Sequence, residues 1–337
     1  MAGIIIAATG KSVYRVMRHG DGKWWGMNVL PNLDAQCLAV DPLNRQSLYA
    51  GGASGGLYAS RDGGLSWSPS PVQPPKMHIS DVAVSRLERH DEGGTIYVGT
   101  EPSSVYKSND AGCHWTDLIS FRDIPSAPTW SFPPRPWTSH IRWITLSPHD
   151  PALILVVVEL GGIMRSDDGG NTWLDRPADA YLDCHALSMP VDKPGVVYEC
   201  ANGGFAISAD SGLTWIPQDE GIDRRYLFSM AVDHHNTDLV YVGGSTDPHH
   251  AHYAQGDARA AIYRRKPDGT WETLGDMASP PLPHFPYGLA TDPDEIGMLY
   301  VGFGNGDIMI SSDRGEHFER PEIEGDKPER IEAMLVL

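Results

Sequence analysis

The chain has 337 residues, with 26 Lys and Arg against 44 Asp and Glu, which gives a formal net charge of −18. Hydrophobic residues make up 41% and charged residues 21%, a balance typical of a folded globular protein rather than a disordered one. The acidic excess argues against binding to nucleic acid or to an anionic membrane surface, because both need clustered Lys and Arg.

The first residues contain one short apolar run, residues 4–8, with no basic residue before it. A run of this length is too short for a signal-peptide core or a membrane span. The four cysteines, Cys37, Cys113, Cys184 and Cys200, include no Cys-x-x-Cys pair and are too few for a disulfide framework. We therefore expect reduced thiols and a cytoplasmic protein.

A repeated pattern, Ser-x-Asp-x-Gly-x-x-aromatic, occurs five times along the chain. Its copies begin at Ser60, Ser108, Ser166, Ser208 and Ser311. Two shorter copies are centred on Asp21 and Asp268. The copies recur every 40 to 60 residues, roughly, which is a spacing typical of propeller blades.

Each copy of the pattern carries the residues of a tight hairpin turn. Glycine accepts a positive φ without steric cost, and Asp and Ser side chains bond the exposed backbone N–H groups. The aromatic residue then packs between neighbouring blades. The pattern therefore predicts a structural role for its aspartates.

Strand-like segments precede each copy; in the first complete repeat they are residues 37–42, 47–51 and 56–60. Small or apolar residues alternate with tyrosine there, as in half-buried strands. Residues 331–337 resemble an inner strand, and residues 1–25 supply the outer strands of the same blade, so pairing the two ends removes an open sheet edge. The sequence predicts an all-β, seven-bladed propeller of four-stranded antiparallel blades, forming one domain over residues 1–337.

These Ser-x-Asp-x-Gly-x-x-Trp copies resemble Asp-box (BNR) repeats, which occur in sialidases, two-domain xyloglucanases, sortilin-type receptors and photosystem-assembly propellers. The resemblance covers nearly the whole chain and implies the propeller fold. A count of seven blades is more similar to that of the xyloglucanase, receptor and assembly types than to that of the six-bladed sialidases. This family includes both hydrolases and non-catalytic scaffolds, so the resemblance alone does not choose a function.

Strand direction alternates within a blade, so the connections divide between two faces. In the propeller enzymes that this chain resembles, the active site lies on the face opposite the Asp-containing turns. Polar side chains at the starts of inner strands, and between second and third strands, are expected to converge there as a binding site. The catalytic candidates are His140, Arg142, His185, Tyr226, Tyr287, Glu101, Glu159 and Asp183.

Long loops are predicted on the same face. Residues 119–139 and 279–286 combine aromatic residues with prolines, and residues 245–260 are rich in histidine. Proline stiffens such loops, and exposed aromatic rings offer stacking platforms for sugars. The substrate-binding candidates are Trp130, Phe132, Trp137, His284 and Arg330.

A single divalent metal ion is a further hypothesis, because imidazoles from separate blades can converge on a cation with a carboxylate as oxygen ligand. The candidate ligands are His78, His140, His185 and Glu101. Their spacing matches no known metal motif, so a metal-free mechanism stays an alternative.

The first functional hypothesis is an enzyme, either a lyase or a glycoside-type hydrolase, acting on a sugar or other small polar substrate. In a lyase, His140 or His185 would be the base and Arg142 would anchor a substrate carboxylate. Tyr226 or Tyr287 would then be the acid.

A hydrolase would instead pair Glu101 with Asp183 or Glu159 as acid and base. The alternative to an enzyme is a non-catalytic binding or assembly propeller whose aromatic loops grip a protein partner. Nothing in the sequence indicates the oligomeric state or the identity of the substrate.

Overall fold

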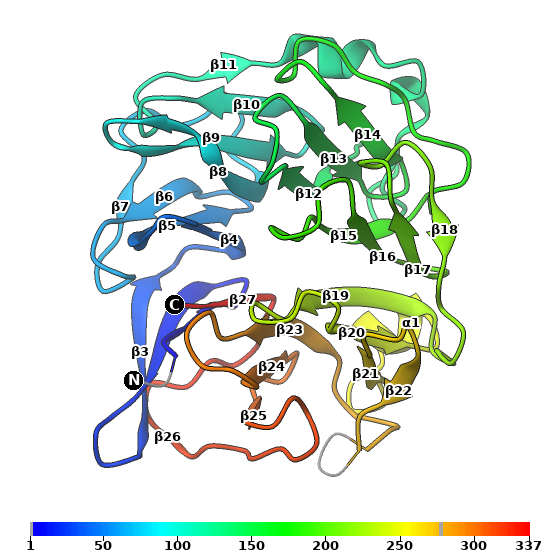
Figure 1. Cartoon of the computed structure of the whole chain (residues 1–337). Coiled ribbons are helices and arrows are strands. Elements are labelled where there is room, and N and C mark those ends of the chain that lie inside the picture. The colour runs from blue at the N-terminus through cyan, green and yellow to red at the C-terminus, as the bar shows by residue number, and fades with distance from the viewer. Residues whose placement is uncertain (1–2, 276–278) are drawn as a thin grey trace. The chain divides into compact units, whose positions relative to one another are not determined.

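The computed structural model describes residues 3–275 and 279–337 and shows a seven-bladed, all-β propeller (Figure 1). Each blade is a small sheet of antiparallel strands, to which the closing blade adds one parallel edge strand, and successive blades follow one another along the chain. The fold predicted from the repeat is therefore confirmed.

The blades take up strands in chain order. The first complete blade contains β4 (Ala35–Asp41), β5 (Asn44–Gly52), β6 (Gly56–Ser60) and β7 (Ser68–Pro69). The second contains β8 (Ile79–His90), β9 (Gly93–Thr100), β10 (Val105–Ser108) and β11 (Thr116–Asp117). The third contains β12 (Ile141–Leu146), β13 (Ile154–Val158) and β14 (Gly162–Ser166). The fourth contains β15 (Cys184–Ser188), β16 (Val197–Ala201), β17 (Gly204–Ser208) and β18 (Ile216–Pro217).

Two further blades precede the closing one. The fifth contains β19 (Tyr226–Val232), β20 (Val240–Ser245), β21 (Ala261–Arg265) and β22 (Trp271–Thr273). The sixth contains β23 (Pro286–Thr291), β24 (Leu299–Phe303) and β25 (Ile308–Ser311). In the two three-stranded sheets, single bridges from Arg165 to Leu174 and from Ile310 to Glu319 mark the position of a fourth strand.

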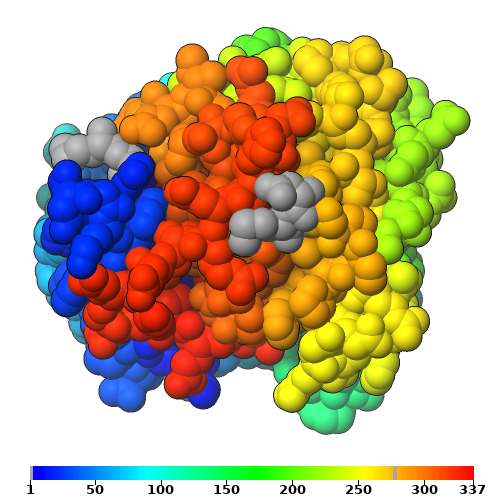
Figure 2. All heavy atoms as spheres, turned by 90° about the horizontal axis from the view of Figure 1, so that it is seen from below, coloured from blue at the N-terminus to red at the C-terminus, as the bar shows by residue number. Residues whose placement is uncertain are grey.

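The closing blade joins the two ends of the chain, as predicted. Inner strand β27 (Ala333–Val336) pairs antiparallel with β1 (Ile5–Ala8), which continues into β2 (Ser12–Arg18) and β3 (Trp24–Pro31). A short strand, β26 (Ile323–Gly325), adds a parallel outer edge on β3. Figure 2 shows the blue N-terminal and red C-terminal segments side by side.

The chain divides into two compact units. The first unit contains Met1–Asn32, Cys200–Phe205 and Pro217–Leu337; the second contains Leu33–Glu199 and Ala206–Ile216. A single domain over residues 1–337 stays a prediction.

The repeated Ser-x-Asp-x-Gly segments form the tight turns that their sequence predicts. Ser60 Oγ accepts the N–H of Gly64 at 2.9 Å and donates to Asp62 Oδ1 at 2.8 Å. Hydrogen bonds from the hydroxyl and N–H of Ser66 lower the pKa of Asp62 to about 2. Gly64 has a φ of +82°, which side-chain-bearing residues rarely adopt. The Ser–Asp and Ser–Gly contacts recur in the turns that begin at Ser108, Ser166, Ser208 and Ser311.

The aromatic residues that end these turns are buried to different degrees. Trp215 and Phe318 are only 3% and 6% exposed, whereas Trp67, Trp115 and Trp173 are half-buried. Tyrosines on the second strands fill much of the core instead. These are Tyr49, Tyr97, Tyr198, Tyr241 and Tyr300, each at most 2% exposed.

The helices in the described part of the chain are short. Two 3-10 turns, Ile119–Asp123 and Ala127–Thr129, lie in the loop of residues 119–139, and helix α1 spans Pro248–His252. In residues 3–275 and 279–337, no helix has the length and apolar character of a membrane span. The four cysteines are free thiols, of which Cys113 alone is exposed.

Candidate functional site

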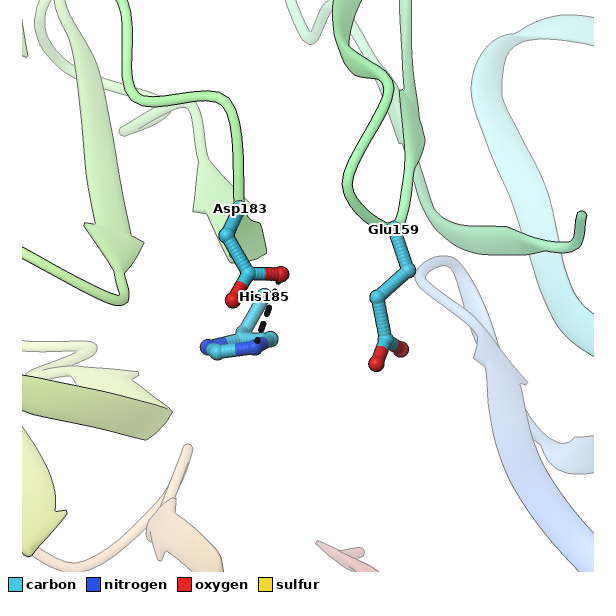
Figure 3. A group of neighbouring side chains, drawn as sticks. All are labelled: Glu159, Asp183 and His185. Atoms are coloured by element: carbon cyan, nitrogen blue, oxygen red, sulfur yellow. Dashed lines mark ion pairs between the residues drawn. The ribbon is translucent and has the colours of Figure 1, made fainter. Parts of the chain in front are cut away.

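Three polar side chains of the second unit meet at the ends of neighbouring strands (Figure 3). Glu159 follows β13, Asp183 precedes β15, and His185 lies within β15. One ligand atom from each residue lies within 4.8 Å of those of the other two. This group, which we call the carboxylate site, brings together three of the predicted catalytic residues.

Glu159 is held by two residues at the start of β12. His140 Nε2 lies 2.9 Å from Glu159 Oε2, and Arg142 Nε lies 3.8 Å from the same oxygen. Burial alone would raise the pKa of Glu159. The hydrogen bond from His140, with the nearby charges of His140, His185 and Arg142, outweighs burial and lowers this pKa to about 2. Glu159 is therefore a firmly ionised carboxylate.

Asp183 and His185 point to the same side of their strand because alternate residues of a β-strand share a face. Asp183 Oδ1 lies 3.5 Å from His185 Nε2 (dashed in Figure 3), and their side chains are 14% and 1% exposed. Asp183 is thus a largely buried carboxylate next to a fully buried imidazole.

Glu101, another predicted acid, has different partners. Arg135 donates to both carboxylate oxygens, with Nε–Oε1 and Nη2–Oε2 distances of 2.8 and 2.6 Å, and His78 Nδ1 lies 3.6 Å from Oε2. Burial opposes ionisation, but Arg135 and His78 prevail and lower the pKa of Glu101. Arg135 is missing from the residues predicted from the sequence, where only its position between Pro134 and Pro136 distinguishes it.

The four predicted metal ligands do not form one group. His78 contacts Glu101, whose oxygens are occupied by Arg135, and His140 contacts Glu159. Among the described residues, the side chains with the spacing that a metal ion requires are those of the carboxylate site. Two carboxylates and an imidazole suit a divalent cation. A metal ion held by Glu159, Asp183 and His185, in place of the four predicted ligands, is therefore the alternative to a metal-free site.

The aromatic residues predicted to bind substrate have different surroundings. Trp130 packs against Phe121, with 5.2 Å between ring centroids, and so supports its own loop. Phe132 meets the ring of His140 edge-on at 4.6 Å. Trp137 is 80% exposed, which makes it the best placed of the three to stack on a ligand.

The two predicted catalytic tyrosines lie in the first unit, where His252 joins them. Tyr226 Oη lies 2.6 Å from His252 Nε2, and Tyr287 Oη lies 2.8 Å from His252 Nδ1. Arg330 Nη2 donates to Tyr287 Oη at 3.2 Å. Burial raises the pKa of Tyr287 to about 12, so its phenol stays protonated. His252 belongs to the predicted histidine-rich loop, but nothing in the sequence distinguishes it from His249.

A pocket of about 270 Å³ lies beside these residues, and His284 and Arg330 are among those that line it. Two predicted substrate-binding residues therefore share a pocket with Tyr287. The other residues assigned to a lyase, His140, Arg142 and His185, belong to the second unit.

Comparison with known proteins supports the fold more strongly than any activity. No family model matches this chain. A xyloglucanase of Hypocrea jecorina (strain QM6a) is 29% identical over 221 residues, which cover 53% of this chain and 25% of that protein. This chain therefore matches about a quarter of the length of that relative.

Solved propellers of two kinds are similar to this chain. The GH74 xyloglucanase of Xanthomonas campestris matches 85% of this chain and 45% of its own, with a TM-score of 0.62 and 17% identity. YCF48 bound to a D1 peptide matches 85% of this chain and 81% of its own, with a TM-score of 0.59 and 17% identity. At these identities the likeness establishes the propeller fold alone.

Proposed function

We propose that this chain is a glycoside hydrolase of the Asp-box propeller family, and that its carboxylate site cleaves a glycosidic bond in a polysaccharide. The observation that carries the proposal is the meeting of Glu159 and Asp183 beside His185, with ligand atoms within 4.8 Å of one another. A xyloglucanase that is 29% identical over a stretch covering 53% of this chain supports a glucan as the substrate.

Hydrolysis of a glycosidic bond by two carboxyl groups needs one ionised carboxylate and one proton donor. Glu159, with a pKa lowered to about 2, meets the first requirement. We assign proton delivery to Asp183, which is 14% exposed and lies 3.5 Å from His185. Arg142 and His140 are positioning residues that keep Glu159 charged and oriented.

The proposal is tested with Glu159→Gln and Asp183→Asn on xyloglucan, with release of reducing ends as the readout. Each substitution removes a carboxylate while keeping its shape, so kcat should fall about 100-fold or more at an unchanged Tm. Glu92→Gln, which removes an exposed carboxylate between β8 and β9, is the matched control. Wild-type turnover in both site variants contradicts the assignment, and an inert wild type on xyloglucan and other β-glucans contradicts the substrate class.

A second function, binding of a protein partner, is favoured by the exposure of Trp137. Its ring is 80% exposed, and the similar propeller YCF48 was solved with a bound peptide. A partner retained by the wild type and by Glu159→Gln, but lost with Trp137→Ala, would support binding over hydrolysis.

A further inference from the structure

The pocket in the first unit has an unusual charge balance for this protein. Its lining includes Arg330, two histidines, and the amides of Gln255 and Asn305, and no Asp or Glu is found among its described residues. The whole chain carries a formal net charge of −18. Glu332, which pairs with Arg330, lies outside the lining, so the pocket presents a guanidinium and amide groups with no carboxylate of its own in the described lining, which favours an anionic ligand.

Arg330 is fixed in this pocket by two neighbours. Its Nε lies 2.5 Å from Glu332 Oε1, and its Nη2 donates to Tyr287 Oη at 3.2 Å. The guanidinium carbon also lies 5.0 Å from the centre of the Tyr287 ring. These contacts involve Nε and Nη2, and the guanidinium has further N–H groups on Nη1 for a ligand. A guanidinium held in place in this way is suited to a carboxylate.

Tyr287 offers a second donor in one of the two tautomers of His252. When His252 carries its proton on Nδ1, it donates to Tyr287 Oη, and Tyr226 donates to His252 Nε2. Arg330 donates to the same Tyr287 oxygen. The phenol proton of Tyr287 then has only a long contact to Ala251 O, at 3.5 Å, so an acceptor atom in the pocket would be a better partner.

We infer that this pocket binds a hexuronic acid, a sugar that carries a carboxylate. Arg330 and Tyr287 would take the carboxylate, Asn305 would bond ring hydroxyls, and Phe285 supplies an apolar wall. The volume of about 270 Å³ suits one sugar unit, since pockets for drug-sized molecules begin near ~300 Å³. One arginine carries a single positive charge. This charge balances a carboxylate monoanion but leaves half the charge of a phosphate dianion uncompensated.

This inference does not rest on the proposed hydrolysis, because every residue that it uses belongs to the first unit. Calorimetric titration of the full chain with glucuronate and with galacturonate tests it. Glucose serves as the neutral sugar and inorganic phosphate as the anion without a ring. At least one uronate should bind saturably, and glucose and phosphate should bind about tenfold more weakly or worse, the loss expected for a charge-assisted contact.

Variants of Arg330 assign the binding to this pocket. Arg330→Gln should weaken uronate binding about tenfold or more, and Arg330→Lys should have an intermediate effect because it keeps the charge without the planar fork. Arg18→Gln, which removes an exposed arginine from the same unit, is the matched control and should bind like the wild type. Glu159→Gln should also bind uronate normally, which separates this test from that of the hydrolase.

Several results would overturn the inference. These are no saturable uronate binding, equal affinity for glucose, tighter binding of phosphate, or unchanged binding in Arg330→Gln. If Arg330→Gln lowers Tm, Gly304→Ala is the second variant. Its added Cβ would lie 2.9 Å from Tyr287 Cε2, so it displaces the ring that orients Arg330, and unchanged uronate binding there would overturn the inference equally.

Discussion

His140 and Glu159 face each other across two paired strands, and the imidazole controls the charge of the carboxylate. Ile141 pairs with Val158 in the β12–β13 register. This register places His140, which precedes Ile141, opposite Glu159, which follows Val158. The result is a His140 Nε2–Glu159 Oε2 distance of 2.9 Å. Strand pairing within one blade therefore sets the ionisation of the carboxylate that we assign to hydrolysis.

Substitution of His140 should change the pH range of activity. His140→Ala removes a hydrogen bond that favours the carboxylate form, so the pKa of Glu159 should rise from about 2 toward its ordinary value of 4.5. Glu159 must be ionised to act, so the acidic limb of kcat/KM against pH should move to higher pH. A profile that falls uniformly at every pH, with an unmoved acidic limb, would contradict this control of Glu159.

The sequence predicts the fold and part of the site because those features depend on local pattern and strand register. The turn chemistry repeats in each blade, and the register alone places His140 beside Glu159. Loop conformations are not encoded in this way. Arg135 reaches Glu101 across 34 residues of sequence, and His252 reaches both Tyr226 and Tyr287 through a five-residue helix, so neither pairing has a local sequence signal.

Removal of divalent metal should leave hydrolysis unchanged. Glu159 Oε2 already has His140 Nε2 at 2.9 Å and the charged Arg142 Nε at 3.8 Å, so this oxygen is less available to hold a cation. Untagged protein dialysed against EDTA should keep its kcat, and elemental analysis should show no stoichiometric metal. One equivalent of a metal that disappears together with activity, and that Asp183→Asn fails to bind, would instead assign Glu159, Asp183 and His185 as its ligands.

Glu199 should make the protein less stable as the pH rises. It is fully buried in β16, and burial, with Asp179 nearby, raises its pKa from 4.5 to about 8 although the Tyr181 N–H favours ionisation. The folded state therefore holds a proton that the unfolded state has released between these values. The stabilisation is fully present below about pH 4.5 and is lost as pH rises toward 8.

Glu199→Gln isolates this contribution. The variant keeps the hydrogen-bonding shape but cannot titrate, so its free energy of unfolding should fall less than that of the wild type between pH 5 and pH 8, by an amount on the order of a few kcal/mol. Chemical denaturation at the two pH values measures the difference, with the exposed Glu220→Gln as the matched control. Parallel pH dependence in wild type and Glu199→Gln would show that Glu199 does not carry the proton.

The aromatic residues of the repeated turns should differ in their contribution to stability. Trp215 is 3% exposed, and its Nε1 donates to Gly212 O at 3.2 Å, whereas Trp67, at the same position of another turn, is half-buried. Trp215→Ala leaves a cavity and should lower the free energy of unfolding by about 3–5 kcal/mol, and Trp67→Ala should cost clearly less because its ring already contacts water. Denaturant titration of the two variants measures both losses. Equal losses would mean that the aromatic position of the repeat contributes uniformly, independent of burial.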